Sequence, residues 1–419
     1  MVGMEKATRG RYTLLNFALA LSIITYVDRV AIASAATAIR GELGLSTIQM
    51  GWVFSAFTFA YAAFEIPSGW WGDVVGPRRV LTRIVLWWSA FTMLTGAAWS
   101  LASLLVARFL FGVGEAGAYP NISRTFARWF PAPERGSAHG VVFMGSRLGG
   151  AIAPPLVVML MAWIGWRKSF FVCGLLGVVW CVAWRRWFRD DPANHPSVNA
   201  AELETIREGL GPDHPPRLPW SALLSSNLLM ICMMYFCMAY TLYFNLTWLP
   251  TYLREARGFS VSQAGWIAGV ILLTGACGSF LGGRLTDHLV KTRGLRIGRR
   301  IGVVTLPLSG ALLVAAAQTE NPIVASILLA ATLGVADLNV SACWSMCHDV
   351  GGESAGTVSG AMNTFGNIGG AISPLVVGYA VQWWSSWTVP FYVTAFVYVL
   401  GGALTFLIDP TKRLSPTAK

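Results

Sequence analysis

Seven charged side chains lie within segments of this chain that are otherwise apolar, and they are the residues best suited to chemistry. They are Asp28, Glu65, Glu115 and Asp337, together with Arg29, Arg108 and Arg147. A charge in the hydrocarbon core of a bilayer costs at least about 2.5 kcal/mol, so such residues face a protein-lined cavity and mark the path of an ion or substrate. The sequence therefore predicts a charged cavity inside a membrane protein, and the arginines favour an anionic ligand.

The composition is that of a protein embedded in a lipid bilayer. Of the 419 residues, 55% are hydrophobic and 12% are charged, and the mean hydropathy is +0.56. Soluble domains carry roughly 25% charged residues. The net charge of +11 would also suit a nucleic-acid-binding protein, but the distribution of the basic residues argues against that class.

Twelve segments are long and apolar enough to span a membrane as helices, since a span needs about 20 mostly apolar residues. They are residues 12–34, 48–70, 79–98, 100–122, 137–161, 166–188, 225–250, 262–286, 300–318, 322–345, 355–382 and 387–408. The longest polar stretch, 189–224, contains one short amphipathic piece at 200–209 and is expected to be a cytoplasmic linker. We therefore expect an all-α membrane protein with two six-helix halves, residues 1–188 and 225–419.

Basic residues indicate how the spans are oriented. With the N-terminus inside, 23 of the 31 lysines and arginines fall on the inner side and five on the outer side. Cytoplasmic loops carry such an excess, so we expect both termini in the cytoplasm and the protein in the inner or plasma membrane. The first apolar run is too long for the core of a signal peptide and is interpreted as an uncleaved span.

The two halves share repeated motifs. The stretch 149–154 (Gly-Gly-Ala-Ile-Ala-Pro) recurs 220 residues later at 369–374 (Gly-Gly-Ala-Ile-Ser-Pro). A Gly-x-x-x-Asp pattern followed by arginines occurs at 69–79 and again from 283 onward. Parallel repeats of this kind are common in transporters, where substrate binds near the midplane at the interface of the repeats. We therefore expect pseudo-symmetric halves with a substrate site between them.

On these motifs the chain resembles the major facilitator superfamily over nearly its whole length. The stretch from Gly69 to Arg79 looks like that family's motif between spans 2 and 3. The resemblance implies a cytoplasmic gating motif formed by Gly69, Asp73, Arg78, Arg79 and, in the second half, Asp287. The alternative is a loop whose basic residues serve only to orient the protein.

Within the superfamily the chain resembles the anion:cation symporters, which take up sugar acids such as hexuronates, glucarate and galactonate with protons. The residues that carry this resemblance are Tyr26-Val27-Asp28-Arg29, Tyr61, Ile66-Pro67-Ser68-Gly69-Trp70, Arg108, Gly112, Glu115, Ala116 and Pro120, followed by Trp129-Phe130-Pro131. The resemblance implies import of an organic anion by alternating access.

Arg108 and Glu115 are seven residues apart, which on a helix is about 10 Å along one face. Arginine is permanently charged and binds carboxylates in a bidentate manner, so we expect Arg108 to bind the substrate carboxylate. Glu115 and Asp28 are the candidate proton carriers, because burial and a nearby arginine act in opposite directions on the proton affinity of a carboxyl group. Arg29, adjacent to Asp28, could supply that arginine. Static ion pairs are the alternative for each.

Several polar residues in the spans are candidate substrate ligands. Tyr26 and Tyr61 can offer hydroxyl groups to a polyhydroxy substrate, and Glu65 follows Tyr61 by one helical turn. By resemblance, Ser341 and Asn363 fall where sugar-acid transporters place polar contacts. Packing of the aromatic rings and hydrogen bonds between helices are the alternatives.

Three residues depart from the pattern of sugar-acid transporters. Arg147 and Glu65 stand where glutamines are usual, and Asp337 adds an acid in span 10. Arg147 could bind a second anionic group, which would make the substrate a dianion or a differently shaped acid. It could instead pair with Glu65 or Asp337 and leave the charge of the site unchanged. The sequence leaves both possibilities open.

Other classes of protein fit less well. An exporter of drugs or cations with the same fold would more often show carboxylates without paired arginines, and a facilitator would move the anion without protons. A membrane sensor would need a soluble signalling domain, and the longest loop is too short for one. The chain shows no nucleophile–base pair, metal-binding spacing or phosphate-binding loop, so we expect no enzyme activity and no cofactor. Sodium coupling is possible, and a monomer suffices for this architecture.

Overall fold

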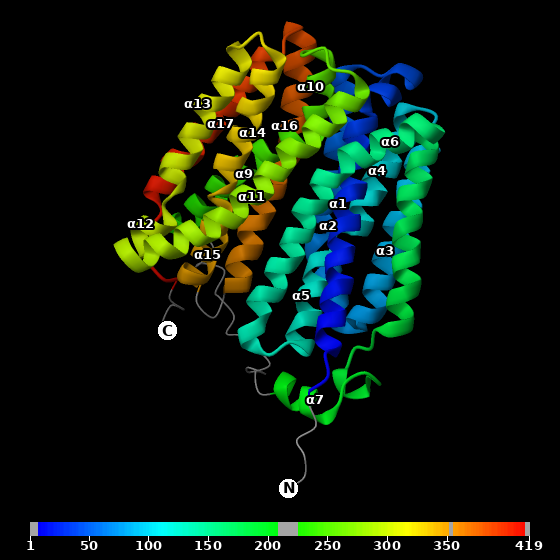
Figure 1. Ribbon diagram of the computed structural model, residues 1–419, viewed down its shortest axis with the longest axis vertical. Coiled ribbons are helices and arrows are strands. Elements are labelled where there is room, and N and C mark those ends of the chain that lie inside the picture. Colours follow the sequence, from blue (N-terminus) through cyan, green and yellow to red (C-terminus); the bar gives the residue numbers. More distant parts are fainter. Residues whose placement is uncertain (1–6, 208–224, 352–354, 415–419) are drawn as a thin grey trace. The chain divides into compact units, whose positions relative to one another are not determined.

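The computed structural model describes residues 7–207, 225–351 and 355–414. Within these ranges a few side chains lie outside the description, namely those of residues 66, 69, 70, 72–74, 127, 132, 133, 135–137 and 355–357. The regular elements of the described part are all helical (Figure 1).

The helices up to residue 207 are numbered from the N-terminus. They are α1 (Gly10–Leu43), α2 (Thr47–Val75), α3 (Pro77–Gly96), α4 (Leu101–Glu115), α5 (Ala118–Trp129), α6 (Ala132–Trp187), the 3₁₀ helix η1 (Pro192–Asn194) and α7 (Ala200–Arg207). The later helices are α9 (Ser226–Thr247), α10 (Leu249–Glu255), α11 (Val261–Arg293), α12 (Leu295–Arg299), α13 (Gly302–Gln318), α14 (Pro322–Asp337), α15 (Val340–Gly351), α16 (Ala355–Trp384) and α17 (Thr388–Leu407).

Each of the twelve predicted spans falls on one or two of these helices. Nine apolar segments of the described chain are long enough to cross a membrane, and one of them, within α6, contains two predicted spans. The backbone of α6 leaves helical geometry at Gly165, with φ 76° and ψ 163°, which separates the spans at 137–161 and 166–188. Glycine adopts this positive φ without the steric cost of a Cβ atom. The two remaining predicted spans are α2 and α3.

Contacts group the chain into two compact units. Unit 1 contains Met1–Ala31, Ala60–Ala153 and Leu160–His214, and unit 2 contains Ile32–Phe59, Pro154–Met159 and Pro215–Lys419. The boundaries run through α1, α2 and α6, so each of these helices contributes to both units. The domain limits predicted from the order of the spans, at residues 188 and 225, stay a prediction.

The repeated glycine motifs make equivalent contacts in the two units. In unit 1 a Cβ atom on Gly149 of α6 would lie 2.5 Å from the carbonyl oxygen of Ile23 on α1. In unit 2 a Cβ atom on Gly369 of α16 would lie 2.5 Å from the carbonyl oxygen of Phe236 on α9. Small residues allow membrane helices to approach this closely. The sequence repeat therefore corresponds to a repeated helix–helix contact.

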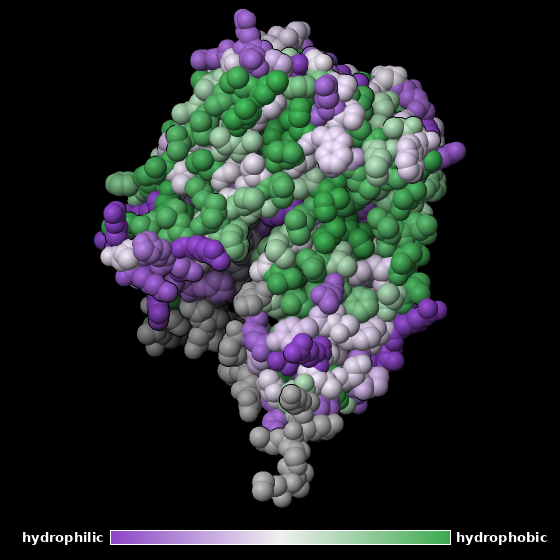
Figure 2. All heavy atoms as spheres, in the orientation of Figure 1, coloured by the Kyte–Doolittle hydropathy of each residue, from purple (hydrophilic) through white to green (hydrophobic). Residues whose placement is uncertain are grey.

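The surface is apolar along the helices. Figure 2 shows hydrophobic residues covering the middle of the helices on the face drawn, with hydrophilic residues gathered at the helix ends. Large apolar side chains such as Val304 and Phe396 are 69% and 67% exposed. Lipid, rather than water, is the solvent that such a surface favours.

The short helix α7 packs against the start of α1 in unit 1, and Figure 1 shows the two side by side. Glu202 of α7 is 0% exposed and accepts hydrogen bonds from Thr8 Oγ1 at 2.6 Å, the Gly10 amide at 2.9 Å and the Arg11 amide at 3.0 Å. Arg11 in turn pairs with Glu134 of α6 at 3.0 Å. The carboxylate satisfies amides that a helix N-terminus leaves unpaired. The amphipathic segment expected at 200–209 therefore includes a helix that binds the N-terminal end of α1.

Candidate functional site

A break in the fourth predicted span places Glu115. The span expected over 100–122 is divided into α4, which ends at Glu115, and α5. Pro120 cannot donate to the carbonyl of Ala116, and its ring would clash with that carbonyl in a continuous helix. Gly117 takes a left-handed conformation with φ 88°, and its Cα faces Ser68 of α2 at a distance that leaves no room for a Cβ atom. These residues set the acid at a helix end inside unit 1.

Glu115 forms an ion pair with Arg29. The Nε–H group of Arg29, on α1, donates to Oε1 of Glu115. The side chain of Glu115 is 1% exposed and that of Arg29 is 10% exposed. Removing one partner of a buried pair leaves the other charge uncompensated, at a cost of about 3–5 kcal/mol. The two side chains therefore act as a unit, which the sequence did not predict because it assigned Arg29 to Asp28.

Two tyrosines flank the same arginine. The guanidinium carbon of Arg29 lies 5.1 Å from the ring centroid of Tyr26 and 4.7 Å from that of Tyr61. Both distances are within the range of cation–π attraction. The two rings restrict the position of the guanidinium group. The structure thus brings together three of the predicted ligands, Arg29, Tyr26 and Tyr61.

Arg108 lies deeper than Arg29. It is 2% exposed, and its guanidinium carbon is 4.4 Å from the ring centroid of Phe111. Its charged neighbours include Glu115, Asp28 and Arg29. Arg108 and Glu115 both belong to α4, as the seven-residue spacing implied. The predicted role of Arg108 as the substrate clamp stays a prediction.

Asp28 is buried beside these charges. It is 1% exposed, and its carboxylate faces the indole of Trp88 and the hydroxyl of Thr92, both on α3, without reaching hydrogen-bond geometry in the described part of the chain. At this site, unit 1 therefore brings together two buried acids, Asp28 and Glu115, with two arginines, Arg29 and Arg108. With both acids ionised, these four charges cancel.

A cluster of hydroxyl groups joins α1, α5 and α6 in unit 1. The hydroxyl of Tyr119 is 2.8 Å from Ser146 Oγ and 3.1 Å from Ser22 Oγ, and the two serine oxygens are 2.7 Å apart. Ser22 donates to the carbonyl of Val142 at 2.7 Å. The sequence analysis missed these residues. The signal was available, because Ser22 precedes Tyr26 by one helical turn and Ser146 precedes Arg147 directly.

Arg147 and Glu65 are both partly buried in unit 1. Glu65 lies on α2 near the hydroxyl of Tyr61. Arg147 lies on α6 and directly follows Ser146 in the sequence. Whether Arg147 binds substrate or pairs with an acid stays open, as it did on the sequence.

The predicted ligands of the second half lie in unit 2. Ser341 on α15 donates to the carbonyl of Ser279 on α11 at 3.1 Å, which is the hydrogen bond between helices that stood as its alternative. Asn363 lies on α16 and is partly buried. Asp337, the last residue of α14, is 4% exposed. Substrate contacts by Ser341 and Asn363 stay predictions.

The gating motif is described only in part. The side chains of Gly69 and Asp73 lie outside the described residues. Arg78 donates its backbone N–H to Oδ1 of Asp190 at 2.8 Å, so an acid from the linker caps the start of α3. Arg79 is exposed. The gating role of these residues stays a prediction, and Asp190 is an added contact that the sequence did not indicate.

The corresponding acid of the second half is Asp287. Its side chain is 71% exposed and lies 3.9 Å from Arg299, which also pairs with Asp349 at 2.7 Å. Exposed ion pairs contribute about 0–1 kcal/mol. Asp349 is therefore the stronger partner of Arg299, and the gating role of Asp287 stays a prediction.

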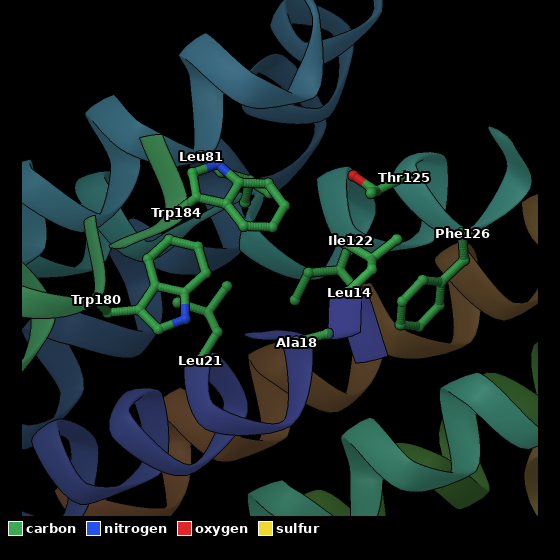
Figure 3. Close-up of a pocket in the computed structure, with 9 residues that line it drawn as sticks. All are labelled: Leu14, Ala18, Leu21, Leu81, Ile122, Thr125, Phe126, Trp180 and Trp184. Carbon is green, nitrogen blue, oxygen red and sulfur yellow. The ribbon is translucent and has the colours of Figure 1, made fainter. Parts of the chain in front are cut away.

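A separate apolar cavity lies in unit 1. Figure 3 shows Trp180, Trp184, Phe126 and Leu14 around it, and its lining also includes Ala18, Leu21, Leu81, Ile122 and Thr125. No charged side chain is among these lining residues. The cavity therefore lacks the groups that would bind an anion, and we interpret it as a packing gap between α1, α3, α5 and α6.

Comparison with known proteins identifies relatives over almost the whole chain. The model of the Major Facilitator Superfamily matches residues 18–374. A probable sulfoacetate transporter of Cupriavidus necator is 38% identical over 413 residues, which are 97% of this chain and 96% of that protein. A D-galactonate transporter of Escherichia coli is 32% identical, and the match covers 99% of both chains.

The fold is also that of solved structures. A bacterial homologue of the human lysosomal transporter Spinster, in an inward-facing and unoccupied conformation, matches with a TM-score of 0.79 at 19% identity. The match covers 95% of this chain and 96% of that one. At this identity the likeness concerns the fold alone.

Proposed function

Because the chain belongs to the Major Facilitator Superfamily, in the anion:cation symporter group that its motifs indicated, we propose that it imports a small organic anion together with protons. The chain is a membrane transporter and not an enzyme. The symport, its direction and the identity of the anion are the parts that we propose.

The observation that carries the proposal is the ion pair between Arg29 and Glu115. An anionic substrate and the Glu115 carboxylate compete for the same guanidinium group. Protonation of Glu115 removes one competitor and leaves Arg29, held between Tyr26 and Tyr61, to bind the substrate. Proton binding and anion binding therefore favour each other, which is the thermodynamic condition for symport.

The charge balance of unit 1 suggests the number of protons. Asp28 and Glu115 together balance Arg29 and Arg108, so each added proton leaves one uncompensated positive charge. One proton would thus match a monoanion, and two protons would match a dianion. Burying uncompensated charge is costly, so proton and anion should occupy the site together.

We propose that the substrate is a small dianion of the sulfonate–carboxylate type. Support comes from the probable sulfoacetate transporter at 38% identity and from Arg147, a third arginine within the apolar spans, which directly follows Ser146 of the hydroxyl cluster. The second candidate is a sugar acid, which the relatives named for galactonate and the hydroxyl groups of Tyr26 and Tyr61 favour. Export or facilitated diffusion of other small molecules is the alternative mode of transport.

The distribution of basic residues supports an orientation. We propose that both termini lie in the cytoplasm and that the protein acts as a monomer in the inner or plasma membrane. The 23 basic residues on one side against five on the other support the cytoplasmic location of both termini.

Proton uptake by proteoliposomes tests the function. Sulfoacetate, galactonate, glucarate and glucuronate are added separately, and external alkalinisation is recorded for the wild type, Glu115→Gln and the control Glu320→Gln, an exposed acid ahead of α14. We expect alkalinisation with sulfoacetate in the wild type and control, and its loss in Glu115→Gln. Anion uptake without proton movement in all three proteins would indicate a facilitator and overturn the symport.

A further inference from the structure

Unit 2 contains an acid at the position that corresponds to Glu115 in the internal repeat. Glu115 is the last residue of α4 and Asp337 is the last residue of α14, and in both cases the span resumes after two residues, as α5 and α15. The two acids are 222 residues apart, close to the 220 residues that separate the repeated glycine motifs. The internal repeat thus places a buried carboxyl group at an interrupted helix in each half.

The surroundings of Asp337 form a small cavity with polar groups. The cavity is lined by Met238, Thr241, Leu242, Leu333, Ala336, Asp337 and Tyr398. Tyr398 of α17 is 2% exposed, and its hydroxyl makes no hydrogen bond with the described residues. Oδ2 of Asp337 packs against α11, where a Cβ atom on Gly275 would lie 2.8 Å from it. Asp337 and Tyr398 therefore share an enclosed space in unit 2.

The hydroxyl group of a tyrosine can form a hydrogen bond with a neighbouring carboxyl group in either protonation state of the acid. The ionised carboxylate is acceptor-only, and the O–H of Tyr398 can donate to it. The protonated acid carries an O–H donor, and the oxygen of Tyr398 can accept from it. Tyr398 is the only other titratable residue in the described lining. The shared cavity therefore offers Asp337 a hydrogen-bonding partner in either protonation state.

We propose that Asp337 is a second proton-binding site, in unit 2, and that one transport cycle loads it in addition to the acids of unit 1. This proposal rests on the proposed symport. If the protons on Asp28 and Glu115 balance the charge of the anion, the proton on Asp337 makes the cycle electrogenic. An inside-negative membrane potential then drives uptake.

Infrared difference spectroscopy tests the site without any substrate. Spectra of the protein in lipid are recorded between mildly alkaline and mildly acidic buffer, for the wild type, Asp337→Asn, Tyr398→Phe and the control Glu320→Gln. We expect a carboxylic-acid carbonyl band that disappears in Asp337→Asn, shifts in frequency in Tyr398→Phe and persists in the control. A band unchanged in Asp337→Asn would overturn the proposal. Loss of the band on adding sodium at constant pH would overturn it in favour of sodium.

Anion uptake under a potassium diffusion potential tests whether the proton on Asp337 makes the transport cycle electrogenic. We expect an inside-negative potential to stimulate anion uptake severalfold in the wild type. In an Asp337→Asn variant that still transports the anion, we expect the same potential to change the uptake little. Equal stimulation of both proteins would contradict a coupled proton on Asp337. If no anion is transported by any variant, the proposed function fails, while the infrared spectra still decide whether Asp337 binds a proton. The amount of protein in each proteoliposome preparation is measured as a control for protein loss.

Discussion

At the scale of the residue, the chemistry of unit 1 depends on which cation faces which acid. The sequence predicted the charged residues themselves, because a charge in an apolar span is conspicuous. It did not predict that Glu115 pairs with Arg29, because that contact joins α1 to α4 and helical spacing describes only one helix at a time. Helical spacing offered Ser22 as a candidate, but the contacts of Ser22 and Ser146 with Tyr119 join three helices and could not be predicted in the same way.

The structure favours Arg29 as a substrate contact, since its side chain is 10% exposed and lies between two tyrosine rings. We expect Arg29→Lys to weaken substrate binding about tenfold, or ~1.4 kcal/mol, because lysine cannot pair with an anion and Glu115 in the same planar geometry. Isothermal titration of the purified protein measures this. Arg108→Lys is the matched comparison, and wild-type affinity in that variant would remove Arg108 as the clamp.

At the scale of the element, interruptions of helices place the functional groups. Length and hydropathy predicted a continuous span at 100–122, and they did not reveal the break after Glu115. Pro120 and Gly117 were the available signals, but prolines are tolerated within membrane helices and so do not by themselves indicate a break. The helix in the linker was predicted correctly. Its contact with the start of α1 was not, because Glu202 binds residues that are about 190 positions away in the sequence.

The break can be tested at Gly117, where φ is 88°. We expect Gly117→Ala to lower the melting temperature and abolish uptake, because a left-handed backbone costs a residue with a Cβ atom about 1–2 kcal/mol and the new methyl group would collide with Ser68. Gly140→Ala is the control, since a Cβ atom there meets nothing within 4 Å. Thermal unfolding and uptake are measured on both, and a fully active Gly117→Ala would show that the break tolerates a side chain.

The linker provides a pH-dependent contact at His195. Burial between Trp129 and Trp187 lowers the pKa of this histidine. Its Nδ1 accepts the Ser197 amide at 3.1 Å, and its Nε2 lies 2.8 Å from the Trp187 carbonyl, so the neutral ring with the proton on Nε2 satisfies both contacts.

Because the folded state lowers the pKa of His195, the neutral form stabilises the fold above the unfolded value of about 6.5. That contribution is lost as the pH falls through the lower pKa of the folded protein. We expect the melting temperature of the wild type to fall in mildly acidic buffer and that of His195→Gln to change less. Parallel melting curves for the two proteins would show that other groups cause the acid sensitivity.

At the scale of the whole molecule, the sequence predicted the helical fold and twelve spans, because lipid imposes both the length and the apolar character of each span. Exposed tryptophans add a feature that composition alone did not locate. Trp99 and Trp163 of unit 1 are 78% and 80% exposed, and Trp266 and Trp383 of unit 2 are 63% and 68% exposed. In the orientation that we propose, all four are near the outer ends of spans, where tryptophan favours the interface of the membrane.

Contacts within unit 2 hold the end of α1 to α10. Arg40 pairs with Glu255 at 2.7 Å, and both side chains are partly exposed, 19% and 32%. Such a pair contributes up to about 1 kcal/mol. We expect Arg40→Glu to slow uptake by a factor of a few and Arg40→Glu combined with Glu255→Arg to restore it, whereas two additive losses would show that the pair contributes nothing to transport.

The division of α1 between the two units has a mechanical consequence. The boundary falls between Ala31 and Ile32, two residues beyond Arg29. The remainder of α1, to Leu43, is about 17 Å long, so a tilt of roughly 10° at the boundary would displace its far end by about 3 Å. The boundary therefore lies close to the ion pair of Arg29 and Glu115. Any bend of α1 at this boundary would therefore occur two residues from the guanidinium group that pairs with Glu115.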